Sequence, residues 1–407
     1  MSEKILWTEN KMVKKYGEGV STVLFSAAEV EKAKSFHQTF PSYEPTPLQN
    51  LSHLAEKLKV GGIYVKDESY RFGLNAFKAL GGSYAIARYL AQRLHRDISE
   101  LPYALLTSQE VREKLGEITF VTTTDGNHGR GIAWTARQLH QKAVVYMPKG
   151  SSTYRLAKIR AEGAEASIVD MNYDDAVRMT AAEAEEKGWV VVQDTAWEGY
   201  VEIPTWIMQG YGTMSAEALE ELNRLGIKKP THIFVQAGVG ALAGSVQGYF
   251  ASVFGEERPK TIIAESNKAA CLFKSVLAND GMPRNVGGEM QTIMAGLACG
   301  EPNPIGWNIL RDYSQLFCSC PDWIAARGMR TLGNPLKGDP RVISGESGAV
   351  TTGLLLSLLE DKNMSEVRES LGLDENSQIL IFNTEGDTDP EKYRSIVWDG
   401  EFPSAAR

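Results

Sequence analysis

Lys78 lies in the run Asn75-Ala76-Phe77-Lys78-Ala79-Leu80-Gly81-Gly82, at the start of a predicted helix rich in glycine and alanine. In such surroundings an amine is poorly solvated, so it loses its charge readily and can form a Schiff base with an aldehyde. Forty-seven positions later the chain reads Asp125-Gly126-Asn127-His128-Gly129, between a strand-like run at 118–123 and a predicted helix. A loop that leads from a strand into a helix presents backbone N–H groups to an anion. These two segments predict a nucleophilic lysine and an anion-binding loop.

A third loop follows the strand-like run at 231–236 and reads Ala237-Gly238-Val239-Gly240-Ala241-Leu242-Ala243-Gly244. Small residues allow backbone amides to close around a phosphate at a helix N-terminus. The same residues could instead let a helix pack closely on the sheet. A dinucleotide-binding fingerprint fits less well, because the spacing is Gly-x-Gly-x-x-x-Gly and the preceding residues lack the acid that binds a ribose.

The fourth loop, Thr384-Glu385-Gly386-Asp387-Thr388-Asp389, follows a strand-like run at 377–383. A neutral hydroxyl at the end of a strand could meet a pyridine nitrogen without protonating it. A polar turn that closes the last core strand is the alternative for this loop alone. The four loops in this order predict pyridoxal phosphate chemistry on an amino acid.

These segments resemble those of the fold-type II pyridoxal-phosphate enzymes, the group of tryptophan synthase β and threonine dehydratase. The resemblance extends roughly from Pro45 to Asp389. Asn75-Ala76 stands where that group usually has a serine before the lysine, and Asp125 replaces the serine of a Ser-Gly-Asn-His-Gly loop. The loop from Asp125 to Gly131 resembles the form found in the diaminopropionate ammonia-lyase subfamily.

The resemblance implies roles for the loop residues. Lys78 would hold the cofactor as a Schiff base, Asn127 would bind the phenolic oxygen of its ring, and Thr384 would meet the ring nitrogen. A turn residue with left-handed φ is the alternative for Asn127, and a helix cap is the alternative for Glu346. The expected cofactor contacts are Phe77, Lys78, Asn127, Gly238, Val239, Gly240, Ala241, Leu242, Glu346 and Thr384.

Two carboxylates distinguish the chemistry of this chain. Asp194 follows a predicted strand at 189–193 and would bind an ammonium group or cap the next segment. A β-ammonium leaving group carries a charge to be paired, whereas a hydroxyl does not. Partial burial would raise the pKa of Asp125 toward the range of a general base. In racemases that resemble this group, a serine at the position of Asp125 serves the face of the cofactor opposite the lysine, so the resemblance implies that Lys78 serves the L-isomer and Asp125 the D-isomer. The expected substrate contacts are Thr124, Asp125, Gly126, His128 and Asp194, with Lys78, Asp125 and Asp194 in catalysis and no catalytic role for His128.

The predicted elements favour an α/β fold with two domains, each built on a mainly parallel sheet flanked by helices. A helix is expected at 80–94 and a strand at 63–66. Alternating strands and helices are expected at 118–123, 129–140, 143–147, 153–162, 166–170, 173–187 and 189–193, and further strands at 231–236, 261–265, 341–344 and 378–383. We place a large cofactor-binding domain at 1–87 and 202–407, with a small domain at 88–201 inserted in it.

Composition agrees with an ordinary globular protein. The chain has 407 residues, enough for about two domains, with 43% hydrophobic and 23% charged residues and a net charge of −8. The sequence has no basic tract, no apolar signal core and no long apolar run, so we expect a cytoplasmic protein that binds neither nucleic acid nor membrane. Among the four cysteines, Cys271 and Cys299 could pair, although cytosolic disulfides are uncommon, and no metal-binding spacing occurs.

The resemblance thus implies a homodimer that takes a small amino acid. It predicts αβ-elimination from D- and L-2,3-diaminopropionate to pyruvate and ammonia. A serine or threonine ammonia-lyase is one alternative, which shares the cofactor and removes water. A non-catalytic amino-acid-binding α/β protein is the other, and it would have no covalently bound cofactor.

Overall fold

The computed structural model describes residues 3–124 and 126–404. Contacts divide the chain into two compact units, of which unit 1 comprises Met1–Ser26, Thr46–Tyr70 and Met214–Arg407, and unit 2 comprises Ala27–Pro45 and Arg71–Thr213. The predicted small domain at 88–201 lies within unit 2. This unit also takes in α1 (Ala27–His37), because His37 Nε2 lies 3.0 Å from the carbonyl oxygen of Leu80 in α3 (Lys78–Arg93).

Unit 2 is built on a sheet of four parallel strands in the order β6-β5-β4-β7. The strands are β4 (Thr119–Thr123), β5 (Lys142–Met147), β6 (Glu165–Ile168) and β7 (Val190–Val191), and the helices between them are α6 (Asn127–Gln138), α7 (Thr153–Ala161) and α8 (Tyr173–Lys187). The predicted alternation of strands and helices is therefore confirmed, although β7 is shorter than expected.

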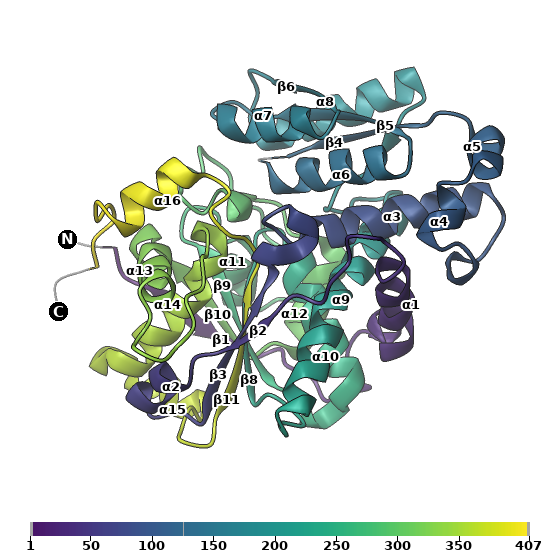
Figure 1. Ribbon diagram of the computed structural model, residues 1–407. Helices are drawn as coiled ribbons and strands as arrows, with labels where there is room; N and C mark the ends of the chain where they lie inside the picture. The colour runs from purple at the N-terminus through teal and green to yellow at the C-terminus, as the bar shows by residue number, and fades with distance from the viewer. Residues whose placement is uncertain (1–2, 125, 405–407) are drawn as a thin grey trace. The chain divides into compact units, whose positions relative to one another are not determined.

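Alternation along β5 sends its apolar side chains to both faces of this sheet. Val145 and Met147 pack with the alanines of α6 and with Ile159 of α7. Val144 packs on the opposite face with Ala184 of α8. Figure 1 shows α6 and α8 on the two sides of the sheet. Both faces are covered, as a parallel sheet requires.

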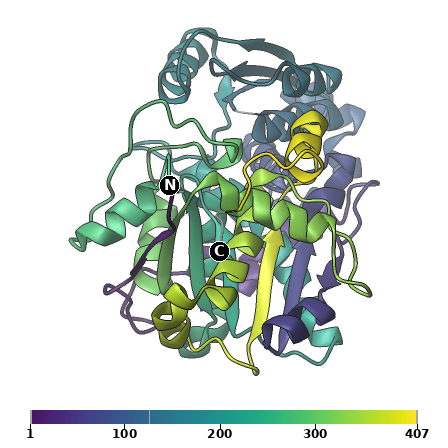
Figure 2. The same cartoon turned by 90° about the vertical axis from the view of Figure 1, so that its left-hand side faces the viewer.

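Unit 1 is built on a sheet of seven strands in the order β1-β10-β9-β8-β11-β3-β2. The five central strands are parallel, and the two edge strands are antiparallel to their neighbours. The strands are β1 (Leu6–Glu9), β2 (Leu48–Asn50), β3 (Gly62–Asp67), β8 (His232–Gln236), β9 (Lys260–Ser266), β10 (Leu316–Cys320) and β11 (Gln378–Asn383). Figure 2 shows β11, in yellow, within this sheet.

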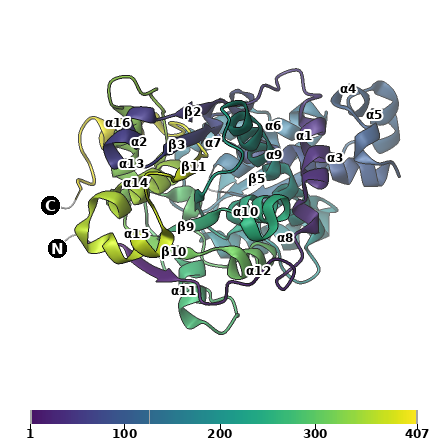
Figure 3. The same ribbon diagram turned by 90° about the horizontal axis from the view of Figure 1, so that it is seen from below.

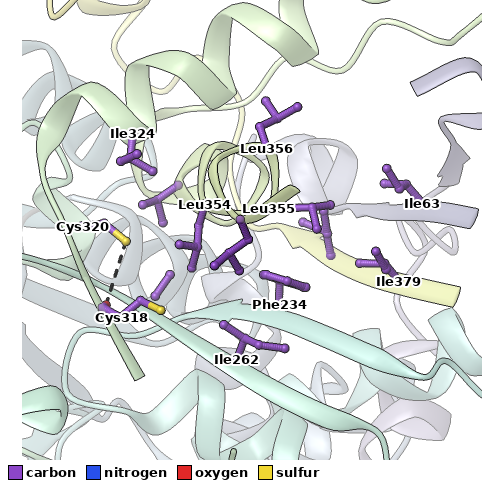
Figure 4. Close-up of a cluster of buried hydrophobic side chains, with 14 of the residues drawn as sticks. Ile63, Phe234, Ile262, Cys318, Cys320, Ile324, Leu354, Leu355, Leu356 and Ile379 are labelled. Atoms are coloured by element: carbon purple, nitrogen blue, oxygen red, sulfur yellow. Dashed lines mark hydrogen bonds between the residues drawn. The ribbon is translucent and has the colours of Figure 1, made fainter. Parts of the chain in front are cut away.

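The core of unit 1 lies between this sheet and two long helices, α13 (Asp322–Gly333) and α14 (Glu346–Glu360). Phe234 and Ile262 from the strands meet Leu354 and Leu355 from α14, and all four are fully buried (Figure 4). Elsewhere in unit 1, α10 (Ala241–Phe254) and α12 (Pro304–Tyr313) pack side by side (Figure 3). The predicted fold class, with a mainly parallel sheet and flanking helices in each unit, is confirmed.

The described part of the chain contains further α-helices. They are α2 (Ser52–Leu58), α4 (Tyr103–Leu106), α5 (Gln109–Leu115), α9 (Glu202–Arg224), α11 (Cys271–Ala278), α15 (Ser365–Leu371) and α16 (Pro390–Val397). None of the helices in the described part of the chain combines the length and apolarity needed to cross a membrane.

One strand prediction is wrong. Residues 341–344 form no strand, because the N–H of Val342 bonds to the carbonyl oxygen of Leu332 at 3.1 Å and the segment leads into α14. The fifth central strand is instead β10, whose five residues are all buried. The sequence of β10 contains no β-branched residue and no alternation, so the usual strand signals are missing.

Candidate active site

Lys78 is the first residue of α3, and its Nζ contacts the carboxylate of Asp194 in an ion pair within unit 2. The lysine side chain is 20% exposed and the aspartate side chain 10%. Burial by itself raises the pKa of Asp194. The charges of Lys78 and His128, with the hydrogen bond from Lys78, outweigh burial and lower that pKa to about 2. Asp194 therefore carries a full negative charge at neutral pH beside the amine of Lys78.

Aromatic rings surround the lysine amine. The Nζ of Lys78 lies 5.3 Å from the ring centre of Phe77 and 5.7 Å from that of Tyr211. Those two rings pack at 4.7 Å, and the Tyr211 side chain is fully buried in α9. Burial raises the pKa of the Tyr211 hydroxyl, so the ring stays neutral. Tyr211 was not among the predicted residues, because nothing in the sequence of α9 links it to Lys78.

A close approach of two helices fixes the start of α3. A Cβ on Gly131 of α6 would lie 3.0 Å from the backbone nitrogen of Ala79 and 3.1 Å from the carbonyl carbon of Lys78. Such contacts are tighter than nearly all that real Cβ atoms make, so a side chain at this position would push the two backbones apart. The backbone that carries Lys78 therefore rests directly on α6, which begins at Asn127.

Thr124 shapes the loop before α6. Its hydroxyl oxygen accepts hydrogen bonds from the N–H groups of Gly126 at 2.9 Å and Gly129 at 3.1 Å. The helix begins at Asn127, two residues earlier than predicted, so Asn127 lies in a helical turn and the left-handed alternative for it is wrong. The predicted role of Asp125 falls on a residue outside those that the structure describes.

His128 links this loop to the segment before Asp194. Its Nε2 donates a hydrogen bond of 2.8 Å to the carbonyl oxygen of Val192, and its side chain is buried. This contact gives His128 a structural role. The segment after Asp194 is not helical until α9 begins at Glu202, which leaves no helix beside Asp194 for it to cap.

In unit 1, the loop between β8 and α10 contains the residues predicted to bind phosphate. Gly240 has a φ of +95° and stands immediately before α10, a conformation that glycine adopts without strain. The N–H of Asn303 bonds to the carbonyl oxygen of Val239 at 2.7 Å, which holds the loop in place. The loop thus ends on the N-terminus of a helix of 14 residues, whose N–H groups and dipole favour an anion. These features fit a phosphate group.

Thr384 directly follows β11 and is buried, at 3% exposure. Its hydroxyl oxygen accepts a hydrogen bond of 2.6 Å from the amide nitrogen of Gln236, the last residue of β8. A neutral hydroxyl at the end of a parallel strand fits a pyridine nitrogen. Gln236 was not among the predicted site residues, although a polar residue that ends a buried strand just before a glycine loop is a signal that could have identified it.

Glu346 is the first residue of α14 and is 4% exposed. The segment before it is tied to the Thr384 loop, because the N–H of Gly345 bonds to the carbonyl oxygen of Glu385 at 3.0 Å. The side chain of Glu385 accepts a further bond from the N–H of Ser347 at 3.1 Å. Glu346 therefore stands beside the predicted ring-nitrogen loop, and its contact with the cofactor stays a prediction.

None of the four cysteines, which all lie within the described residues, forms a disulfide. The sulfur of Cys271 lies 3.8 Å from the backbone oxygen of Cys299. Burial and nearby acidic groups raise the pKa of the Cys271 thiol well above its usual range. The thiol stays protonated at neutral pH and is a poor nucleophile.

A family model described as pyridoxal-phosphate dependent enzyme matches residues 39–369. The diaminopropionate ammonia-lyase of Salmonella typhimurium is 51% identical over 401 residues, which cover 98% of this chain and 99% of that relative. The threonine dehydratase of Haemophilus influenzae is 26% identical over 235 residues, which cover 58% of this chain and 38% of that enzyme.

Two solved structures of the Escherichia coli diaminopropionate ammonia-lyase match nearly the whole chain. The complex with D-serine has a TM-score of 0.92 and 50% identity, and covers 99% of each chain. The complex with an aminoacrylate-pyridoxal-phosphate azomethine reaction intermediate has a TM-score of 0.90 and 49% identity, and covers 98% of each chain.

Proposed function

Because the chain belongs to the pyridoxal-phosphate dependent enzymes, we propose that it is a carbon–nitrogen lyase that removes ammonia from 2,3-diaminopropionate. The products are pyruvate and ammonia, and both D- and L-isomers are substrates. The identity of 51% to a diaminopropionate ammonia-lyase over 98% of the chain supports this assignment.

The observation that carries the proposal is the ionised carboxylate of Asp194 beside the amine of Lys78. In the structure this carboxylate binds an ammonium group, that of Lys78 itself. Against the effect of burial, the charges of Lys78 and His128 lower the pKa of Asp194 to about 2, and a β-ammonium group in place of the lysine ammonium would stabilise the charged carboxylate in the same way. A substrate with a β-ammonium group needs such a partner, since the ammonium must lose its hydration when it enters the site. An enzyme that eliminates hydroxide has no such need.

When bound, the cofactor supplies a ring that accepts the electron pair released as the Cα proton leaves. Lys78 holds the cofactor covalently and takes the Cα proton of the L-isomer. Asp125 takes the Cα proton of the D-isomer from the other face. Asp194 binds the β-ammonium group and orients it for departure.

The remaining residues hold the cofactor and the substrate. The N–H groups from Gly238 to Leu242 bind the phosphate, and the left-handed conformation of Gly240 supports this role. Asn127 donates to the phenolic oxygen, Thr384 meets the ring nitrogen, and Phe77 and Glu346 contact the ring. The substrate is held by the loop at 124–128, through Thr124 and Gly126, and His128 supports that loop through its hydrogen bond to Val192. The D-serine bound to the E. coli relative supports a site that accepts D-amino acids.

A serine or threonine ammonia-lyase is the second candidate function. The match to a threonine dehydratase favours it, but that match covers 58% of this chain at 26% identity. The non-catalytic alternative is not retained, because the chain belongs to a family of enzymes.

A panel of substrates tests the proposal. We expect purified enzyme with bound cofactor to release pyruvate from both isomers of 2,3-diaminopropionate at least about tenfold faster, in kcat/KM, than from serine, since one charged contact is worth that much. Threonine, which would yield another keto acid, serves as the second comparison. Keto acid from serine or threonine but not from diaminopropionate would overturn the assignment.

Asp194→Asn is expected to lower kcat/KM for diaminopropionate about ten- to a hundredfold. The reason is the lost charged hydrogen bond, worth roughly 1.5–3 kcal/mol. Residual activity on serine should fall much less, because serine has no β-ammonium group. The measurement is the ratio of kcat/KM for diaminopropionate to kcat/KM for serine, in the wild type and in the variant. Equal losses on both substrates would mean that Asp194 only positions Lys78.

We also infer that the enzyme is a cytoplasmic homodimer that acts in amino-acid catabolism. Four cysteines that form no disulfide fit a reducing compartment. The homodimer is inferred from the resemblance to the family.

A further inference from the structure

The contact between Gln236 and Thr384 lies inside unit 1, at the ends of the neighbouring parallel strands β8 and β11. Gln236 is 1% exposed. Its Nε2 donates to the Thr384 hydroxyl oxygen at 2.6 Å and to the Phe382 carbonyl oxygen at 3.3 Å. The regular pairing of the two strands ends at Ile381, opposite Phe234. The Gln236 side chain therefore extends the hydrogen bonding beyond the end of the strand pair.

The Phe382 contact decides which end of the amide faces Thr384. A carbonyl oxygen can only accept a hydrogen bond, so the amide nitrogen must point toward Phe382. A flipped amide would place two acceptor oxygens against each other in a buried site, which costs free energy. Both N–H hydrogens of Gln236 are then committed, one to Phe382 and one to Thr384.

This orientation has a consequence for the hydroxyl of Thr384. Because its oxygen accepts a hydrogen from Gln236, its own hydrogen remains available for another acceptor. No residue in the described part of the chain receives a hydrogen bond from this hydroxyl. The Thr384 hydroxyl can therefore donate a hydrogen bond to a bound group.

We propose that Gln236 is a positioning residue that orients the Thr384 hydroxyl as a hydrogen-bond donor and so holds the pyridine nitrogen of the cofactor in its unprotonated form. The inference rests on the proposed placement of the ring nitrogen at Thr384. A pyridine nitrogen accepts this hydrogen only when it carries no proton. An unprotonated ring withdraws electrons less strongly, which favours rapid loss of the β-substituent over persistence of a carbanion at Cα.

Gln236→Glu tests this by reversing the direction of the hydrogen bond. An oxygen in place of Nε2 accepts the Thr384 hydrogen and, when protonated, still donates to Phe382. The Thr384 hydroxyl then turns a lone pair toward the ring nitrogen and favours the protonated ring. With cofactor labelled at the ring nitrogen, nitrogen NMR of the wild-type holoenzyme should give the resonance of a neutral pyridine. In the variant we expect the pKa of that nitrogen to rise by at least about one unit, a tenfold gain in proton affinity.

Three further variants separate the possible outcomes. Gln378→Glu makes the same change at the other end of β11, where Gln378 accepts a hydrogen bond from Tyr64, and should leave the nitrogen resonance unchanged. Gln236→Met removes the donor without adding an acceptor and should also raise the pKa of the ring nitrogen. It provides the test if Gln236→Glu fails to fold. Thr384→Val removes the hydroxyl and should also move the resonance.

A protonated ring nitrogen in the wild-type enzyme would overturn the inference. A second result would also overturn the inference. In it, Gln236→Glu or Gln236→Met folds, binds cofactor and keeps the wild-type pKa of the ring nitrogen, although Thr384→Val moves the resonance. If Thr384→Val leaves the resonance unchanged as well, the placement of the ring nitrogen at Thr384 is wrong, and with it the inference. Circular dichroism and the cofactor content of each variant establish that it is folded and loaded.

Discussion

Lys78→Ala is expected to lower kcat on diaminopropionate by at least about 10³-fold. The change removes both the amine that binds the cofactor covalently and a general base, and general acid–base catalysis alone contributes roughly 10²–10⁴-fold. Cofactor can still bind without a covalent bond, through its phosphate and ring contacts. Borohydride reduction followed by peptide mapping should attach the cofactor to Lys78 in the wild type and to no residue in the variant.

Control variants are needed because Lys78 forms an ion pair with Asp194. Lys78→Ala leaves a largely buried carboxylate without its cation, which is destabilising in itself. Lys78→Arg keeps a positive charge near Asp194 but cannot form the Schiff base, so we expect it to fold more stably and to be equally inactive. Lys142→Ala, at a side chain that is 59% exposed in the same unit, should retain full activity. Near-native turnover by Lys78→Arg would exclude Lys78 as the residue that binds the cofactor covalently.

Asp125→Asn is expected to lower kcat/KM for D-diaminopropionate by roughly 10²–10⁴-fold, the contribution of one general base. Activity on the L-isomer should be largely retained, because Lys78 takes that proton. Kinetics of the variant on the two enantiomers measure the difference. Exchange of the Cα proton with deuterated solvent gives an independent readout, and it should be lost for the D-isomer alone.

Asp170→Asn is a matched control for this prediction, since its side chain is 85% exposed in the same unit and the change is the same. It should leave both activities unchanged. Parallel losses on both enantiomers in Asp125→Asn would mean that Asp125 binds the substrate ammonium and is not a base. A wild-type enzyme that does not act on the D-isomer would rule out the two-base mechanism altogether.

The sequence by itself determined the loops that carry the chemistry. Short runs rich in apolar or β-branched residues, followed by glycine or small residues, mark the ends of β4, β8 and β11, and such signals are local. The amine of Lys78 was recognisable from its immediate neighbours. Because ligands bind beyond the carboxyl ends of parallel strands, residues just after predicted strands were good candidates for the site.

Only the tertiary structure decided which of these residues meet. Lys78 and Asp194 are 116 positions apart, and Gln236 and Thr384 are 148 positions apart. Their contacts depend on which strands are neighbours and on how closely helices approach, as at Gly131. No local pattern encodes strand order. The strand predicted at 341–344 is wrong and β10 is missed for another reason, because β10 contains no β-branched residue and no alternation. The charge state of Asp194 was likewise decided by the fold, since it follows from partners that the chain brings together only when it is folded.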